Sequence, residues 1–181
     1  MRIISGKWRG RKLNTPKNEE VRPTSDMVKE SAFNIIQFEI EGASVLDLFC
    51  GTGQLGLEAL SRGAKSCVFT DESPEAIALT LKNTALCGAQ DSAEILRREA
   101  VAYLKSARRK FDVVFLDPPY DTELLGKTLE TIFAFDILNP GGIIVCESRS
   151  DKPLPEAEPP YSAAKSYRYG KIKLSLYRRG E

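Results

Sequence analysis

Apolar and polar positions along this chain predict strands and helices in alternation. Five apolar runs are too short for helices and read as strands of a parallel sheet, at residues 44–48, 66–71, 93–96, 111–116 and 143–147. Segments with helical spacing or helix end signals lie before, between and after these runs, at residues 25–38, 54–61, 74–87, 99–105 and 123–135. This alternation predicts an α/β fold with a doubly wound, mostly parallel sheet.

The two ends of the chain carry a different pattern. Residues 2–13 alternate short apolar and basic elements around two glycines, which suits a small β-hairpin or an extended arm. Residues 167–177 alternate in the manner of a closing antiparallel hairpin, after a proline-rich loop at 152–160. We therefore expect one domain over residues 1–181, with a basic N-terminal arm (1–22) and a core (23–181).

The amino-acid composition argues against several kinds of protein and of catalytic site. The chain of 181 residues is 42% hydrophobic and 28% charged, has no apolar segment of membrane-spanning length and begins without an apolar leader, so we expect a soluble cytoplasmic protein. It has four cysteines with no CxxC pair and no histidine. These counts argue against disulfides, zinc and His-activated nucleophiles, and we expect no metal site.

The net charge of +1 conceals an uneven distribution. Residues 1–22 hold seven Lys/Arg and two Glu, and residues 161–181 hold six Lys/Arg and one Glu. Basic ends on an acidic body indicate contact with a polyanion such as RNA, although a solvated surface has the same composition. Trp8 could stack on a base or pack against the domain. The candidates for RNA contact are Lys7, Trp8, Arg9, Arg11 and Arg22.

A glycine-rich turn follows the first predicted strand. Gly51 and Gly53 allow the backbone to approach a nucleotide-like ligand, and the next helix offers its N-terminus, although a purely structural turn has the same pattern. Asp47 lies inside the apolar strand, where a ligand with a cationic amino group would explain it. S-adenosylmethionine has such a group and a nicotinamide dinucleotide does not. Asp71 follows Gly51 by twenty residues, the spacing of a ribose-binding carboxylate.

The sequence Asp117-Pro118-Pro119-Tyr120 ends the most continuous apolar strand. Neither proline can donate a ladder hydrogen bond, so the segment must leave the sheet with its carbonyls free. A carboxylate beside free carbonyls can accept both N–H groups of an exocyclic base amine, and Tyr120 offers a face for stacking. A rigid turn is the structural alternative, but the position at the ligand-binding edge favours Asp117, Pro118 and Tyr120 as catalytic residues.

Together these motifs resemble the class I S-adenosylmethionine-dependent methyltransferases that modify exocyclic amines, and most nearly the bacterial 16S ribosomal RNA guanine-N2 methyltransferase family. The resemblance rests on Met1 to Gly10, Arg22-Pro23-Thr24, Leu46 to Ala64, Phe115 to Tyr120 and the hairpin at Tyr169-Gly170. It implies a Rossmann-like sheet of seven strands, S-adenosylmethionine as cofactor, and 16S RNA or the small ribosomal subunit as partner. We expect a monomer.

Carried over by position, the resemblance implies that Asp47 and the loop with Cys50, Gly51 and Gly53 hold the methionine part of the cofactor. It also implies that Asp71 binds the ribose and that residues 117–120 bind the guanine amine. The chain departs from the family in having Asp71 where Glu is usual, and Arg98-Glu99 where Gly-Asp contacts adenine. Glu99 can still accept from the adenine amino group, with a different reach.

Other functions remain open on the sequence. The shared Asp-Pro-Pro-Tyr motif also fits methylation of adenine N6 or of another nucleic acid. A nicotinamide-dependent oxidoreductase would explain the glycines but not Asp47 or the two prolines. A catalytically silent RNA-binding subunit would not need an intact residue 117–120 motif. Neither the target nucleotide nor the choice between free RNA and an assembled particle follows from the sequence.

Overall fold

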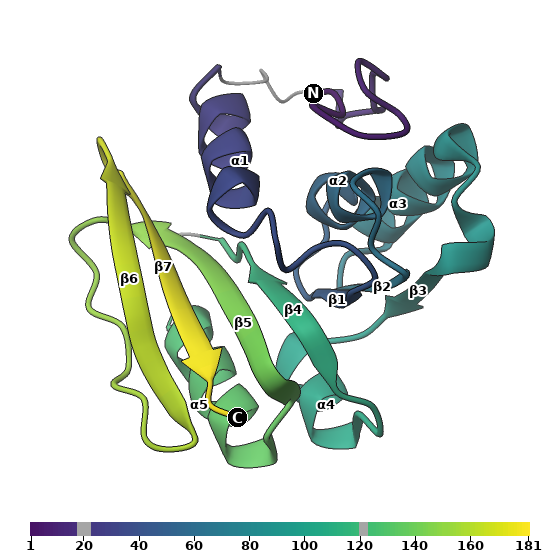
Figure 1. Cartoon of the computed structure of the whole chain (residues 1–181). Helices are drawn as coiled ribbons and strands as arrows, with labels where there is room; N and C mark the ends of the chain where they lie inside the picture. The colour runs from purple at the N-terminus through teal and green to yellow at the C-terminus, as the bar shows by residue number, and fades with distance from the viewer. Residues whose placement is uncertain (18–22, 120–122) are drawn as a thin grey trace.

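A computed structural model describes residues 1–17, 23–119 and 123–181, and it contains one seven-stranded sheet (Figure 1). The strand order is β3-β2-β1-β4-β5-β7-β6. Strands β1 to β5 pair in parallel, whereas β7 pairs antiparallel with both β5 and β6. The bounds are β1 Ser44–Asp47, β2 Ser66–Asp71, β3 Ala93–Arg97, β4 Phe111–Leu116, β5 Leu138–Arg149, β6 Tyr161–Tyr169 and β7 Ile172–Arg179. The expected doubly wound sheet and C-terminal antiparallel hairpin are confirmed.

Helices cover both faces of the sheet. The bounds are α1 Pro23–Ile35, α2 Gln54–Ser61, α3 Pro74–Cys87, a short 3₁₀ turn Gln90–Ser92, α4 Ala100–Ser106 and α5 Leu124–Phe135. Val113 and Phe115 of β4 pack in one apolar cluster with α1 and α2, and Val114 and Leu116 pack in the other with α4 and α5. Successive β4 side chains point to opposite faces, so this strand is buried on both sides.

Helix α3 has the ends that its sequence predicts. The Ser73 hydroxyl accepts a hydrogen bond from Ala76 N at 3.3 Å, Pro74 occupies the first turn, and Gly88 ends the helix in the left-handed conformation. Each of these residues meets a known requirement of a helix terminus. Local sequence therefore determines where this helix begins and ends.

Two boundaries differ from the expectation. Helix α1 begins at Pro23, before Thr24 and Ser25, and ends at Ile35, three residues before Phe38. Phe38 is 90% exposed, because the chain turns after the helix and buries Ile36 and Ile40 instead. Strand β5 begins at Leu138, before the expected start at residue 143, and its pairing with β4 is irregular in this added part.

The N-terminal segment (residues 1–14) is folded onto α2, so the extended-arm alternative is wrong. Only Arg2 and Lys12 form a β-bridge, and the segment is held by a buried carboxylate instead. Glu58 of α2 is 0% exposed and accepts hydrogen bonds from Ile4 N at 2.8 Å and Ser5 N at 3.0 Å. These bonds satisfy backbone groups that a short hairpin of this kind leaves unpaired.

Two cations neutralise Glu58. Arg62 Nε lies 2.8 Å from its carboxylate, and the buried Lys29 Nζ lies 3.7 Å away. Burial lowers the pKa of Lys29, whereas the Glu58 and Asp26 carboxylates raise it. The Lys29 ammonium also donates to Arg2 O at 2.6 Å. The N-terminal segment therefore depends on a charge network that is almost sealed from solvent.

Ser61 and Gly6 complete the attachment. The Ser61 hydroxyl donates to Ser5 O at 2.7 Å and accepts from Trp8 N at 3.0 Å. Gly6 has φ 83°, and a Cβ atom there would lie 1.9 Å from Ser61 O, so only glycine fits this approach. Trp8 is 8% exposed and belongs to the apolar cluster of α1 and α2.

We predict that Glu58→Gln destabilises the protein by about 3–5 kcal/mol, because it leaves the Lys29 ammonium buried without a countercharge and removes one acceptor oxygen. Urea unfolding followed by circular dichroism measures the change. Glu94→Gln is the control: its partner Arg109 and Glu94 itself are 53% and 44% exposed, so the loss should stay below about 1 kcal/mol. Equal losses in the two variants would contradict the role of the buried network.

Candidate functional site

The glycine-rich loop joins the end of β1 to the start of α2. Cys50 N donates to Thr70 O at 3.0 Å, which ties the loop to β2, and Gly53 N donates to Cys50 O at 2.7 Å. Gly51 and Gly53 have φ values of 54° and 79°. A Cβ atom on Gly51 would meet no atom within 4 Å, so the loop backbone faces open space on that side. A ligand can therefore approach this backbone closely.

Asp47 is buried at the end of β1. Its Oδ2 accepts a hydrogen bond from Gly56 N at 2.9 Å, across the loop. The pKa of Asp47 is raised to about 7, chiefly by burial; the Gly56 hydrogen bond lowers this pKa and the Asp71 charge raises it. The Asp47 carboxylate therefore holds the glycine-rich loop in place by bonding to the first turn of α2.

Asp71, the last residue of β2, also holds the glycine-rich loop in place. Its Oδ2 accepts from Gly51 N at 3.0 Å, and its Oδ1 accepts from Ser73 N at 2.9 Å. Asp71 is only partly buried, and each carboxylate oxygen can accept more than one hydrogen bond. The side chain can therefore hold the loop and still bind a hydroxyl group.

Thr80 and Asn83 of α3 also shape the loop, although the sequence offered no signal for them. The Thr80 hydroxyl donates to Gly51 O at 2.9 Å, and its contact with Cys50 Sγ is 3.4 Å long. Asn83 Nδ2 donates to Thr52 O at 2.9 Å and to Asn14 O at 3.0 Å. Asn83 thus joins the glycine-rich loop to the N-terminal segment.

The other two cofactor candidates have structural partners. Cys50 is buried, and burial raises the pKa of its thiol. All four cysteines are free and buried. Glu99 caps α4: its carboxylate accepts from Val101 N at 2.9 Å and Ala102 N at 2.8 Å. Glu99 is exposed, so its carboxylate oxygens remain accessible to a further donor.

Asp117 follows β4 at the carboxyl edge of the sheet. It lines a hollow of about 100 Å³ with Gln54 and Leu55 from the start of α2, and with Lys29 of α1. Asp117 therefore lies across this hollow from the start of α2, directly after the glycine-rich loop, at the edge of the sheet that the fold class predicts. Burial raises the pKa of Asp117 well above its usual range, and the charges of Glu147 and Asp47 raise it further.

A larger cleft adjoins this hollow. Its volume is about 1120 Å³, and it is bounded by Pro118, Pro119, α5, the end of β5 and the loop from Lys152 to Pro155. Apolar walls with a few polar groups are typical of a ligand site. Tyr120, the third catalytic candidate, and Arg22, an RNA-contact candidate, lie outside the described residues.

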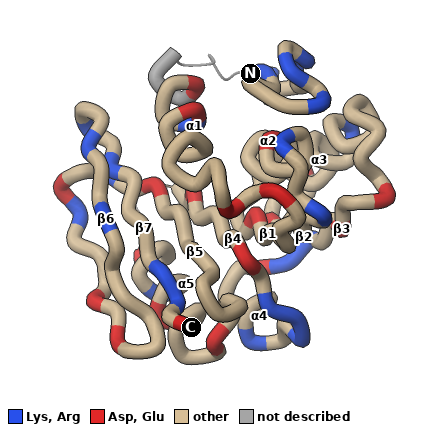
Figure 2. Tube along the Cα trace, viewed as in Figure 1, with Lys and Arg blue, Asp and Glu red and all other residues tan. Residues whose placement is uncertain are grey.

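Basic side chains gather near this edge. Lys7, Arg9 and Arg11 are exposed on the N-terminal segment, and Arg11 Nη1 donates to Leu86 O at 2.7 Å. Figure 2 shows further basic residues on the β6–β7 hairpin, and a separate group around α4 at the opposite edge of the sheet. The β6–β7 turn and the N-terminal segment lie at the same edge of the sheet, on either side of α1 (Figure 1).

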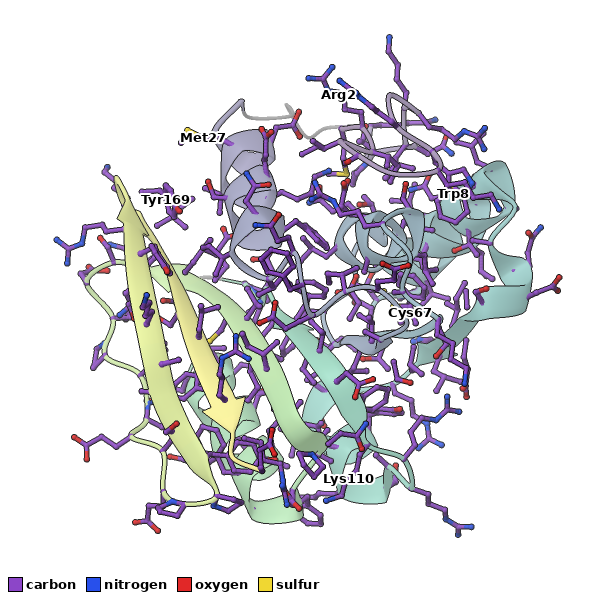
Figure 3. The ribbon with its side chains drawn as sticks, viewed as in Figure 1. Arg2, Trp8, Met27, Cys67, Lys110 and Tyr169 are labelled. Atoms are coloured by element: carbon purple, nitrogen blue, oxygen red, sulfur yellow. The ribbon has the colours of Figure 1, made fainter. Side chains whose placement is uncertain are left out.

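Trp8 does not share this exposure. Its indole lies among the side chains between the N-terminal segment and the helices (Figure 3), with the Lys7 ammonium 5.5 Å from the ring centre. The burial of Trp8 corrects the interpretation in which it stacks on a base, and favours the alternative of packing against the domain. A ring needed by the core is not available to a nucleotide.

Within the described residues, no cluster of three or more His, Cys, Asp or Glu side chains could hold a metal ion. None of the described helices has the length and apolar character needed to cross a membrane.

The site fits S-adenosylmethionine on one further observation. Gln54 lines the hollow with Asp117, and its Oε1 is buried with no hydrogen-bond partner among the described residues. An unsatisfied acceptor is costly unless a ligand supplies a donor, and the cofactor's amino group is such a donor. The glycine-rich loop, the start of α2 and this acceptor are therefore suited to an amino acid and a nucleoside.

Known proteins resemble this chain over nearly its full length. Residues 1–178 match the family described as conserved hypothetical protein 95. The ribosomal RNA small subunit methyltransferase D of Haemophilus influenzae is 40% identical over 159 residues, covering 85% of this chain and 81% of that protein. Its Escherichia coli K12 namesake is 34% identical over 179 residues, covering 99% and 90%.

A solved structure gives the same result. An Escherichia coli protein described provisionally as the methyltransferase yhhF superposes with a TM-score of 0.89 at 31% identity, covering 100% of this chain and 98% of that one. Sequence identity and structural superposition therefore agree. The protein belongs to the conserved hypothetical protein 95 family and is a class I S-adenosylmethionine-dependent methyltransferase.

Proposed function

We propose that this protein transfers a methyl group from S-adenosylmethionine to the exocyclic N2 amine of a guanine in small-subunit ribosomal RNA. The observation that carries the proposal is the position of Asp117, which follows β4 and lines one hollow with Gln54 and Leu55 at the start of α2. The similarity to methyltransferases named for small-subunit ribosomal RNA supports this substrate.

The target amine is a weak nucleophile, because its lone pair is delocalised into the base. We expect the Asp117 carboxylate and the Pro118 carbonyl to accept hydrogen bonds from the two N–H groups of this amine. These hydrogen bonds would hold the amine nitrogen in line with the methyl carbon. When bound, the cofactor supplies a methyl group activated by its sulfonium. The methyl group would pass from the sulfonium sulfur to the amine nitrogen, the cofactor would leave as S-adenosylhomocysteine, and the proton lost by the nitrogen would pass to solvent. We expect no requirement for a divalent ion.

The cofactor would be held by residues that also shape the loop. Gly51 and Gly53 bring the backbone near the methionine part, with Asp47 behind the loop and Gln54 Oε1 as an acceptor for its amino group. Asp71 would accept hydrogen bonds from the ribose, and Glu99 would lie near the adenine.

A paired guanine cannot reach Asp117, so the base must be unpaired or flipped, at a cost of a few kcal/mol. Contacts from Lys7, Arg9 and Arg11 to phosphates would offset that cost. Because Glu58 and Ser61 fasten the N-terminal segment to α2, these cations have a defined position relative to the cofactor loop.

Asp117→Asn tests the function. We expect turnover to fall at least about 100-fold, because the amide offers one acceptor atom and no charge to the amine, while S-adenosylmethionine affinity stays unchanged. Transfer of labelled methyl to small-subunit RNA, with mass mapping of the product, measures this. Asp91→Asn, an exposed change elsewhere, should behave as wild type. Methylation of anything other than a guanine N2 would overturn the substrate assignment.

Asp71→Ala should weaken S-adenosylmethionine binding by about 1.5–3 kcal/mol, because it removes charge-assisted hydrogen bonds to the ribose. Isothermal calorimetry measures the change, and the wild type should bind no NAD. Thermal unfolding of the variant checks that the loop held by Asp71 persists. Undiminished affinity would remove Asp71 from the cofactor site.

RNA affinity should fall with salt at a log–log slope of roughly −3 if about four phosphates of single-stranded RNA are contacted. Changing Arg9 and Arg11 to Ala should shallow the slope by about one unit or more. Lys105 and Arg108, changed together to Ala, are the control at the opposite edge of the sheet. Identical slopes for all three proteins would show that the N-terminal cations are only a solvated surface.

A further inference from the structure

Glu147 occupies the strand end next to Asp117. Leu116 of β4 pairs with Cys146 of β5 in parallel register, so Asp117 and Glu147 are the next residues on two neighbouring strands. Side chains at equivalent positions of parallel neighbours point to the same side of the sheet. Glu147 is partly exposed, and it lines the hollow together with Asp117.

Glu147 also connects the two spaces of the site. Among the described residues, it is the one that lines both the hollow with Asp117 and the cleft with Pro118. A base whose ring lies in the cleft would therefore direct its hydrogen-bonding edge towards the carboxylates of Asp117 and Glu147.

Two adjacent carboxylates are costly to hold in a partly buried site. Glu147 contributes to the raised pKa of Asp117, as does Asp47 of β1. Lys29 of α1 also faces the hollow, but its ammonium lies 3.7 Å from Glu58 and donates to Arg2 O. Arg149 and Lys152 line the adjoining cleft. A ligand with two adjacent donors can bond both carboxylates at once.

Guanine has such an edge. Its N1–H lies beside its N2 amine, so it presents donors at both positions. Adenine and cytosine instead present a ring nitrogen that accepts hydrogen bonds beside their exocyclic amine. A carboxylate facing that ring nitrogen would repel it, and a site built to bond a donor rejects analogues that lack one.

We infer that Glu147 is a specificity-determining residue of the methyl-acceptor site: its carboxylate accepts the guanine N1–H while Asp117 accepts the N2 amine. This inference rests on the proposed function and names the group that selects guanine within it. Glu147 lies in a strand that the sequence marks only as apolar, and no motif singles it out.

The test compares guanine with 2,6-diaminopurine at the target position of a small-subunit RNA. The analogue keeps the 2-amine but has an unprotonated N1. Wild-type kcat/KM should favour guanine by roughly tenfold or more. In Glu147→Gln the preference should shrink to within about threefold, because the amide N–H₂ can donate to the analogue's N1. A wild-type-sized preference in this folded variant would overturn the inference.

Further measurements separate the possible failures. Glu130→Gln, which alters another carboxylate of the cleft, should leave the preference unchanged. Glu147→Gln should also move the acidic limb of the kcat/KM profile to lower pH, because removing a negative neighbour lowers the pKa of Asp117. If Glu147→Gln does not fold, Glu147→Asp replaces it: guanine should stay preferred at a reduced rate, and loss of that preference would refute the inference. Absence of guanine methylation by the wild type would instead refute the proposed function.

Discussion

Parallel strand pairing is the constraint on which the site depends. Strands β1, β2, β4 and β5 run in one direction, so residues that follow them far apart in sequence arrive at one edge. Four carboxylates gather there: Asp47, Asp71, Asp117 and Glu147. Such a cluster is unfavourable unless the carboxylates find donors, and the loop amides of Gly51, Gly56 and Ser73 supply three.

The four carboxylates lie in different surroundings. Asp47 and Asp71 accept hydrogen bonds from backbone N–H groups and stabilise the glycine-rich loop. The pKa of Asp117 is raised by burial and by the charges of Glu147 and Asp47, and strongly shifted pKa values of this kind are typical of functional sites. The same side-chain chemistry thus occurs in two environments at one edge of the sheet.

The N-terminal segment is connected to the cofactor loop through α2 and α3. Glu58 holds Ile4 and Ser5, and Asn83 holds both Asn14 and the carbonyl of Thr52. The segment proposed to bind RNA is therefore attached to the helix whose first turn lines the hollow with Asp117. Movement of the N-terminal segment or of the glycine-rich loop would strain hydrogen bonds that are shielded from water.

Sequence pattern was sufficient for the features that depend on neighbouring residues. Apolar runs located the parallel strands, Ser73, Pro74 and Gly88 marked the ends of α3, and residues 117–119 indicated the chemistry. Each follows from short-range rules of helix capping, strand burial and proline geometry. The positions of Trp8 and Phe38 depended on the tertiary fold, because an exposed and a buried aromatic obey the same local pattern. Glu58, Asn83 and Glu147 gained their roles only when folding brought distant backbone groups and a neighbouring carboxylate to them.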